Sequence, residues 1–294
     1  MLYTGIWNKI CSSSNCSEFQ CSSWWSDLGH HWQTRRYYFL TGSSSAFTAS
    51  PQSIPTTLKK QVLTLPTCAA WALTPLYMTD DGEYIAHAIQ NRCCRAMSDG
   101  SYKDHFGTAS WVIEGLPSQP LLMGDTVVPG HPTSQCSFRS ELTGLYSIAM
   151  MVSKVCKFYA ISSGLVEVGC DGLEALCRAF SPYYWPKPTD AHYDLIVATP
   201  SLLKSCPVDW KFQHIPGHQD DDPSHILDRW AILNINMDLR AKAYWASTRQ
   251  QLDLQLKDIY GEPWGLWIGD EKICTDIRSR IVHHIHGNTA KAKW

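Results

Sequence analysis

The sequence predicts a mixed α/β fold, with five strands in one sheet, helices on its faces and an irregular extension before it. Three stretches between residues 92 and 128 alternate apolar and polar residues, as strands do. A long helical pattern follows, and two further strand patterns are then separated by helices. Strands that follow one another directly pair antiparallel, whereas strands joined through helices pair in parallel. We therefore expect an antiparallel meander that continues into parallel crossovers.

The composition is typical of a soluble globular protein, because 44% of the 294 residues are hydrophobic and 18% are charged. The net charge of −2 excludes a broad nonspecific basic face, so any nucleic-acid contact has to be local. No apolar run is long enough to span a membrane, and the N-terminus lacks the apolar core of a signal peptide. We expect an intracellular protein, cytoplasmic or nuclear, that is not secreted and has no membrane partner.

The twelve cysteines form an N-terminal group and a set of single residues in apolar runs. Cys11, Cys16 and Cys21 recur at intervals of five, which is wider than the CxxC pairs of most zinc sites, so a metal site there is not expected. Single cysteines such as Cys156 and Cys170 are interpreted as small, reduced core residues.

The first ninety residues show little periodicity and include the Ser-rich stretch GSSSAFTASPQS from Gly42. We expect a poorly ordered or irregular extension over residues 1–90. The motif YMTDDGEY, which starts at Tyr77, resembles the Tyr-x-Asp-Asp of polymerase palms but has one residue too many. It is predicted to be a solvated turn.

From Arg92 the pattern becomes regular, and we expect a domain over residues 91–246 with a C-terminal helical tail over residues 247–294. A hairpin is predicted from the first two strands, with its turn at Lys103, Asp104 and His105. The predicted strands are 93–101, 107–114, 120–128, 165–170 and 208–215. The predicted helices are 142–156, 173–180, 193–204 and 230–245.

Four carboxylates are predicted at the ends of strands or beside the apolar stripes of helices. Asp99 is expected at the end of the first strand and Asp171 at the end of the fourth, whereas Glu141 and Asp238 flank the apolar stripes of the first and last long helices. Ligands of α/β sheets gather at such strand ends. Four clustered carboxylates repel one another unless a cation offsets their charge, and oxygen ligands in that number suit Mg²⁺ or Mn²⁺.

The motifs around these carboxylates, SDGS, SEL on a long helix, CDG after a strand, and GH before a helix with N-x-x-x-D, resemble those of type 1 ribonuclease H. The resemblance extends from Arg92 to Trp245. It implies the ribonuclease H-like fold, in which a five-stranded mixed sheet has the order 3-2-1-4-5. It also implies a hydrolase that cleaves the RNA strand of RNA–DNA hybrids with two Mg²⁺ ions, for which Mn²⁺ can substitute.

The resemblance also implies roles for single residues. One metal ion is expected on Asp99 and Asp238, and the other on Asp99, Glu141 and Asp171. His218 matches a loop histidine that transfers protons or assists product release. The remaining matches to the motifs, which are expected to contact the substrate, are Gly100, Ser101 and Asn234. The alternative that His214 and His218 form a zinc pair is disfavoured, because Pro216 and Gly217 break the helix that such a pair needs.

The segment GHQDDD followed by LDRWAILNINMDLRAKAYW is similar to ribonuclease H regions attached to reverse transcriptases of retroelements. A reverse transcriptase in a parent polyprotein is therefore an expected partner beside the hybrid, and we expect a monomer. Two alternatives stay open, namely an inactive nucleic-acid-binding remnant and an integrase-like enzyme that acts on DNA. Asp220, Asp221 and Asp222 form either a solvated acidic loop or a device that raises the local cation concentration.

Overall fold

The computed structural model describes residues 56–117, 119–181, 183–187, 189–221, 224, 226–249, 258–268 and 271–291. Before them it describes three short strands, β1 (Asn8–Ile10), β2 (Glu18–Gln20) and β3 (Tyr37–Tyr38), which pair in the order β1-β2-β3. The cysteine group near the N-terminus lies outside the described residues. Within the described part of the chain, no helix is both long and apolar enough to cross a membrane.

The main sheet has six strands in the order β4-β7-β6-β5-β8-β9. They are β4 (Leu76–Met78), β5 (Cys94–Lys103), β6 (Phe106–Glu114), β7 (Leu122–Val127), β8 (Leu165–Cys170) and β9 (Asp209–His214). Strands β5 to β7 pair antiparallel, and β8 and β9 continue the sheet in parallel from β5. Without β4, the order is the predicted 3-2-1-4-5 of the ribonuclease H-like fold.

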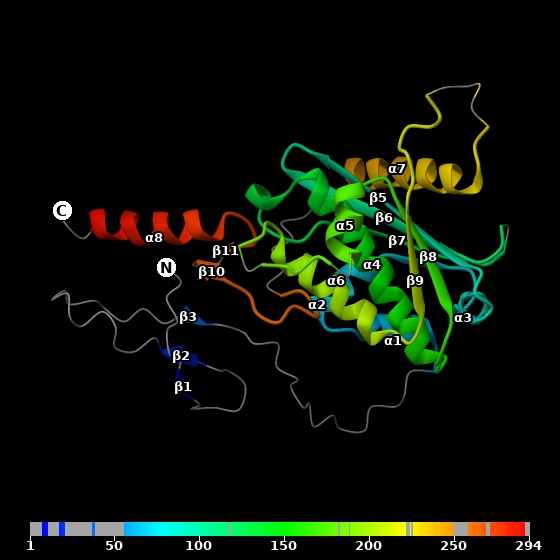
Figure 1. Ribbon diagram of the computed structural model, residues 1–294, viewed down its shortest axis with the longest axis horizontal. Helices are drawn as coiled ribbons and strands as arrows, with labels where there is room; N and C mark the ends of the chain where they lie inside the picture. Colours follow the sequence, from blue (N-terminus) through cyan, green and yellow to red (C-terminus); the bar gives the residue numbers. More distant parts are fainter. Residues whose placement is uncertain are drawn as a thin grey trace.

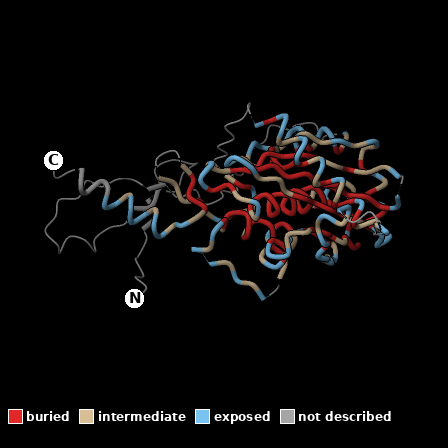
Figure 2. Tube along the Cα trace, turned by 90° about the horizontal axis from the view of Figure 1, so that it is seen from above, coloured by how far each residue is buried: buried red, intermediate tan, exposed pale blue. Residues whose placement is uncertain are grey.

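Helices cover both faces of this sheet, as Figure 1 shows. One face packs against α4 (Ser137–Phe158), α5 (Leu173–Phe180) and α6 (Tyr193–Ser205), and the other against α7 (Arg229–Thr248). Each face of the sheet has its own hydrophobic core, a large one and a smaller one. Neighbouring residues of one strand contribute to these two cores in turn, because successive side chains of a strand point to opposite faces. Ala96 thus joins the large core with Leu142, whereas Met97 joins the smaller one with Met237. The buried chain therefore fills the centre of the molecule (Figure 2).

Residues 56–90 differ from the irregular extension that the sequence predicts. They form α1 (Leu58–Leu63), α2 (Thr67–Ala70), a short 3₁₀ turn (Trp71–Leu73), β4 and α3 (Glu83–Gln90). Leu58, Leu73, Ile85 and Ile89 are fully buried in the large core. The expectation was wrong for this segment because each element is too short to show a clear helical or strand period.

The chain beyond α7 also reaches the core. Residues 258–274 include the two-stranded ribbon of β10 (Trp267–Ile268) and β11 (Glu271–Lys272), and α8 (Ile277–Lys291) follows them. Ile259 is buried in the large core, and the Tyr146 hydroxyl of α4 donates a hydrogen bond to the Tyr260 carbonyl at 2.8 Å. Helix α8 itself extends away from the sheet (Figure 1). The tail thus contains a strap across α4 as well as the expected helix.

Candidate active site

Asp99 lies inside β5 rather than at its end, because the hairpin is longer than the sequence predicts. Asp104 and His105 form its two-residue turn with φ of 53° and 60°, the backbone that such tight hairpins need. β5 consequently continues to Lys103, and Asp99 pairs with Ser110 of β6. On its other side the pairing with β8 ends at Met97. The Asp99 side chain therefore stands where β8 ends, which is the position that the sheet-edge argument requires.

Asp171 follows β8 directly and faces the same place. A small cavity of about 20 Å³ is lined by the carboxylates of Asp99, Asp171 and Asp238. The other side chains that line it are His218, Asp220, Asn234 and Ile235. Three of the four predicted carboxylates thus surround one space, together with the predicted histidine and asparagine.

Glu141, the fourth predicted carboxylate, approaches from α4 and is 9% exposed. Its Oε1 accepts a hydrogen bond from the Gly100 backbone N–H at 3.1 Å. A Cβ on Gly100 would lie 2.6 Å from the Ser140 Cβ, so this contact between β5 and α4 requires glycine. Gly100 therefore has an observed role in holding Glu141, whereas its contact with substrate stays a prediction.

Cys170 is a neighbour of Glu141 that the sequence interpretation placed in the core without a function. Its thiol lies 3.1 Å from Glu141 Oε2, and the sulfur also accepts a hydrogen bond from the Gly172 N–H at 3.3 Å. The alternation of side chains along β8 could have predicted this contact, because it directs Cys170 toward the face of the sheet that α4 covers.

The carboxylates raise one another's pKa values, as close like charges do. Burial, followed by the charges of Asp171 and Asp238, raises the pKa of Asp99 to about 8. Burial, Asp99 and Asp171 also raise the pKa of Glu141 well above its ordinary value. The pKa of Asp171 is raised mainly by burial. Without a cation the site therefore resists carrying its full negative charge.

One carboxylate oxygen of this group lacks a hydrogen-bond donor altogether. Asp171 Oδ1 is buried and has no partner in the described structure. A buried, unpaired carboxylate oxygen is unfavourable unless an ion or an ordered water satisfies it. The donor set of four carboxylates and this free oxygen fits a hard divalent cation such as Mg²⁺.

The asparagine and the histidine occupy supporting positions. Asn234 is 2% exposed, and its Nδ2 donates a hydrogen bond to Asp99 Oδ2 at 3.3 Å. His218 has a φ of 54° in the loop after β9 and faces the cavity. His214 donates from Nε2 to the Asp171 carbonyl at 3.0 Å, so this nitrogen holds the backbone of the site.

Two predicted residues, Ser101 and Asp238, also make contacts outside the cavity. Ser101 lies outside the set that lines the cavity, and its carbonyl accepts a hydrogen bond from the Ser140 hydroxyl at 3.4 Å. Asp238 Oδ2 is 2.6 Å from the Lys242 ammonium, one helical turn further along α7. Of the three acidic residues after His218, Asp220 lines the cavity, whereas Asp222 lies outside the described residues.

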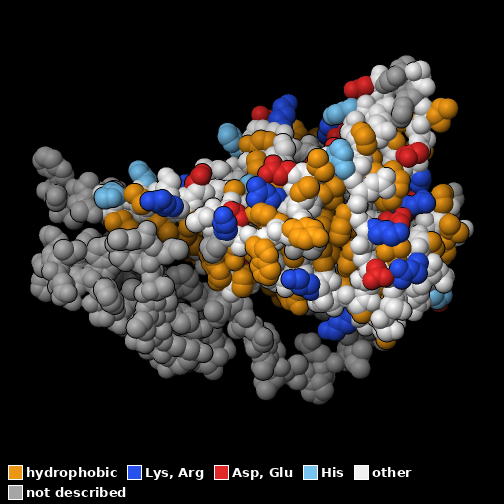
Figure 3. Space-filling model, in the orientation of Figure 1, with side chains coloured by type: hydrophobic (Ala, Val, Ile, Leu, Met, Phe, Trp, Pro, Cys, Tyr) orange, Lys and Arg blue, Asp and Glu red, His pale blue; other side chains and the backbone are white. Residues whose placement is uncertain are grey.

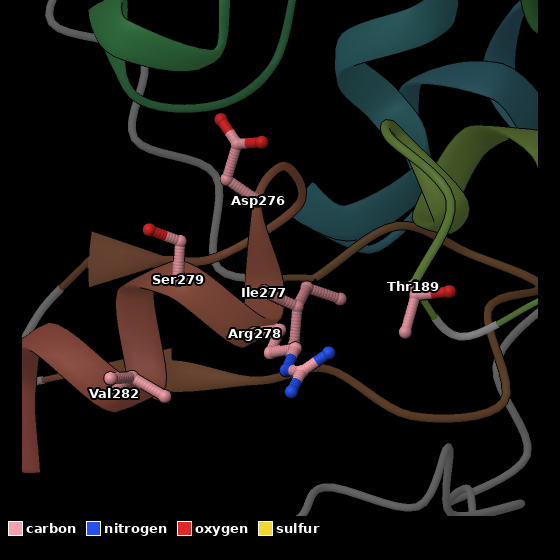
Figure 4. Close-up of a pocket in the computed structure, with 6 residues that line it drawn as sticks. All are labelled: Thr189, Asp276, Ile277, Arg278, Ser279 and Val282. Carbon is pink, nitrogen blue, oxygen red and sulfur yellow. The ribbon is translucent and has the colours of Figure 1, made fainter.

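A larger hollow lies elsewhere, at the start of α8, and has a volume of about 540 Å³ (Figure 4). It is lined by Thr189, Asp276, Ile277, Arg278, Ser279 and Val282. It contains the Asp276 carboxylate beside the Arg278 guanidinium but no second carboxylate, so it lacks the clustered carboxylates of the candidate active site. Figure 3 shows acidic and basic side chains interspersed over one face of the molecule, as the near-neutral charge predicts.

No known protein family matches the sequence, and no curated protein matches it either. Several solved structures are weakly similar in backbone fold to part of the chain. Ribonuclease H1 of the halophilic archaeon Halobacterium salinarum is 14% identical over 53% of this chain and 98% of that chain, with a TM-score of 0.34.

Two further structures are similar to the same extent. The N-terminal ribonuclease H domain of a Mycobacterium tuberculosis protein is 13% identical, with a TM-score of 0.34 over 53% of this chain and 96% of that chain. A ribonuclease H1 named LC11, solved with an RNA/DNA hybrid, is 13% identical, with a TM-score of 0.33 over 50% and 99%. Similarities this weak assign no activity to the chain.

Proposed function

We propose that this protein is an endonuclease that hydrolyses the RNA strand of RNA–DNA hybrids with the help of divalent metal ions. The observation that supports the proposal is the meeting of Asp99, Glu141, Asp171 and Asp238 at one sheet edge, with a buried Asp171 oxygen that lacks a partner. The motifs around these residues resemble type 1 ribonuclease H, in which the same carboxylates bind metal. The alternative zinc pair gains no support, because the His214 ring is engaged with the Asp171 backbone.

In this proposal Asp99 and Asp238 hold one ion, and Asp99, Glu141 and Asp171 hold the other. When bound, two Mg²⁺ ions, or Mn²⁺ in their place, supply an activated water and charge stabilisation for the departing oxygen. The chain's own contribution is to fix the ligands. Gly100 and Cys170 orient Glu141 through hydrogen bonds, and Asn234 orients Asp99.

In this proposal His218 transfers a proton at the edge of the site. Its imidazole is a side chain of the kind that transfers protons, and it lies in a loop that faces the cavity. It can therefore donate a proton to a leaving oxygen or assist the release of the cleaved end. We propose that recognition of the hybrid depends on its shape and on its 2′-hydroxyl groups rather than on its base sequence.

The origin of the chain is a second part of the proposal. The similarity of residues 217–245 to ribonuclease H regions of retroelements supports a reverse transcriptase as a former or present neighbour in one polyprotein. Purification of the chain with and without an upstream reverse transcriptase would test this, because a true neighbour should increase hybrid cleavage by the same carboxylates.

The decisive experiment compares cleavage of a labelled RNA–DNA hybrid with cleavage of duplex RNA and duplex DNA, in Mg²⁺ and after chelation. Cleavage of the RNA strand of the hybrid alone, lost on chelation and restored by Mg²⁺ or Mn²⁺, is the expected result. Cleavage of duplex DNA would instead identify an integrase-like enzyme. Binding of the hybrid without cleavage would identify an inactive remnant.

A further inference from the structure

The buried side of the carboxylate site contains a sulfur atom that the proposed hydrolysis does not need. Cys170 is fully buried at the last position of β8, and its Sγ lies 3.1 Å from Glu141 Oε2. The other Glu141 oxygen is held by the Gly100 N–H, so Oε2 stays directed at the thiol. The contact is therefore fixed from both sides rather than made by a mobile side chain.

The thiol is one corner of a three-atom ligand set. One atom each of Glu141, Cys170 and Asp171 lie within 4.8 Å of one another, and these are the residues that form such a group in the described part of the chain. Mg²⁺ and Ca²⁺ select oxygen donors, whereas a thiolate selects Zn²⁺ and related thiophilic ions. A site with one sulfur and two carboxylate donors thus discriminates in favour of the second class.

Two further observations concern the ligand atoms of this set. Asp171 Oδ1 is buried without a hydrogen-bond partner. The Gly172 N–H donates to Cys170 Sγ at 3.3 Å and thereby fixes the sulfur beside Glu141. A cation at this place would replace the contact between Cys170 and Glu141, while the thiol proton passes to solvent.

We propose that Glu141, Cys170 and Asp171 form a binding site for a thiophilic divalent cation, Zn²⁺ or Cd²⁺, and that its occupation inhibits the enzyme. Two of the four carboxylates are then engaged, so Mg²⁺ is excluded from its complete ligand set. The inhibition rests on the proposed nuclease function, whereas the binding does not.

Co²⁺ is the probe for the binding step, because a cobalt–thiolate bond gives a charge-transfer absorption that oxygen ligands do not give. The full chain is used with Cys11, Cys16 and Cys21 replaced by serine in every sample, which removes the N-terminal thiols as competitors. Cys170→Ser is compared with Cys177→Ser, because Cys177 is an exposed cysteine of α5 and serves as the matched control.

We expect the absorption band in the starting protein and in Cys177→Ser, and its loss in Cys170→Ser. Half-inhibition by Zn²⁺ should require at least a roughly tenfold higher concentration in Cys170→Ser, since changes around a metal typically alter affinity 10–100-fold. Absence of the band from the starting protein, or its persistence in Cys170→Ser, would overturn the proposal. If Cys170→Ser does not fold, Glu141→Gln must weaken Co²⁺ binding, and unchanged binding there would have the same consequence.

The two proposals fail separately. A protein that shows the Cys170-dependent band but does not cleave the hybrid in Mg²⁺ has the cation site without the nuclease. A protein that cleaves the hybrid and shows no band has the nuclease without the cation site.

Discussion

At the scale of single residues, Asp99 is the centre of the site. It is contacted by Asn234, and its pKa is raised to about 8 by burial and by the charges of Asp171 and Asp238. A carboxylate so placed is unfavourable in its ionised form unless a cation is bound, which is why repulsion inside the site and metal binding belong together. Removal of the Asp99 charge should therefore lower the rate of hybrid cleavage and raise the stability of the metal-free protein.

The variant Asp99→Asn should lose hybrid cleavage and gain stability in metal-free buffer. Loss of a shared metal ligand should reduce the rate to below about a hundredth of the parent's. The parent binds a proton at Asp99 with a pKa of about 8 when folded, against 3.8 as the ordinary value. Its metal-free stability therefore falls as pH rises from about 4 to about 8, and the variant lacks this contribution.

Thermal unfolding in a chelator across this pH range, beside single-turnover cleavage, measures both effects. A variant that cleaves at more than about a hundredth of the parent rate would show that Asp99 is not a shared ligand. A variant less stable than the parent at pH 8 would contradict the account of charge repulsion.

His218→Ala should slow cleavage by about 100-fold or less and leave the affinity for Mg²⁺ unchanged. Proton-transfer groups contribute about 10²–10⁴-fold, and a loop residue that assists product release belongs at or below the lower end of this range. Mg²⁺ titrations of the parent and the variant give rates and midpoints together. His87→Ala on the exposed face of α3 is the control. A large shift of the Mg²⁺ midpoint would make His218 a metal ligand and its proposed role wrong.

At the scale of elements, the strand and helix periods of the sequence predicted correctly those elements whose pattern is complete. The strand 165–170 and the helix 173–180 were predicted with the bounds that the structure has, because their patterns are complete within the element. The hairpin turn lies where it was predicted, but the first strand continues to Lys103, so Asp99 lies inside β5 rather than at its end. Asp104 and His105 form a two-residue turn with positive φ, and such a tight turn lets the strands pair up to Lys103 and Phe106.

The motif YMTDDGEY shows a different failure. It is a turn, but its two aspartates accept hydrogen bonds from the backbone at the starts of α1 and α3 instead of facing only solvent. Asp80 accepts hydrogen bonds from the Gly82 and Tyr84 N–H groups at the start of α3. Asp81 accepts from the Leu58 and Lys59 N–H groups, at 2.8 and 3.2 Å, and thereby caps α1. A cap more than twenty residues away along the chain cannot be predicted from a local pattern.

Asp81→Ala should lower the free energy of unfolding by about 1 kcal/mol, the usual effect of removing a helix cap. The loss should come from the start of α1, where two backbone N–H groups lose their acceptor. Asp81→Asn is the matched control, because its amide oxygen can still accept one of these bonds. Denaturant unfolding of the three proteins measures the difference. Equal stability of the alanine variant and the parent would show that solvent replaces the cap without loss.

At the scale of the whole molecule, the sequence predicted the central domain but not what surrounds it. Periodicity and motifs identified the five strands and the four carboxylates, because each signal lies within a short stretch. Helix α4 is stabilised by buried charged residues that lie far from it in the sequence. Arg139 pairs with Asp194 at 2.8 Å, and Lys272 lies 2.6 Å from Glu262, with all four side chains buried. Such a charge cluster appears only after folding brings its members together.

The last prediction concerns the smallest unit that folds. A chain limited to residues 91–246 contains every predicted site residue but lacks Leu58, Leu73, Ile85 and Ile89, which are fully buried against the sheet and α4. It also lacks Lys272, which lies 3.7 Å from Asp194 in the buried cluster next to Arg139. Each large apolar residue removed from a core lowers stability by about 2–5 kcal/mol, and a whole domain has only about 5–15.

We therefore expect residues 91–246 to form no cooperatively folded protein and to cleave no hybrid, whereas residues 56–294 should do both. Circular dichroism during thermal unfolding measures the first property, and the labelled-hybrid assay measures the second. A third chain, residues 56–249, separates the two additions, since it keeps α1 to α3 and loses the strap across α4 together with α8. It should fold with reduced stability, because Arg139 and Asp194 still pair but Lys272 and Ile259 are gone. Cooperative unfolding of residues 91–246 at the temperature of the longer chain would show that the segments before and after the domain do not support it.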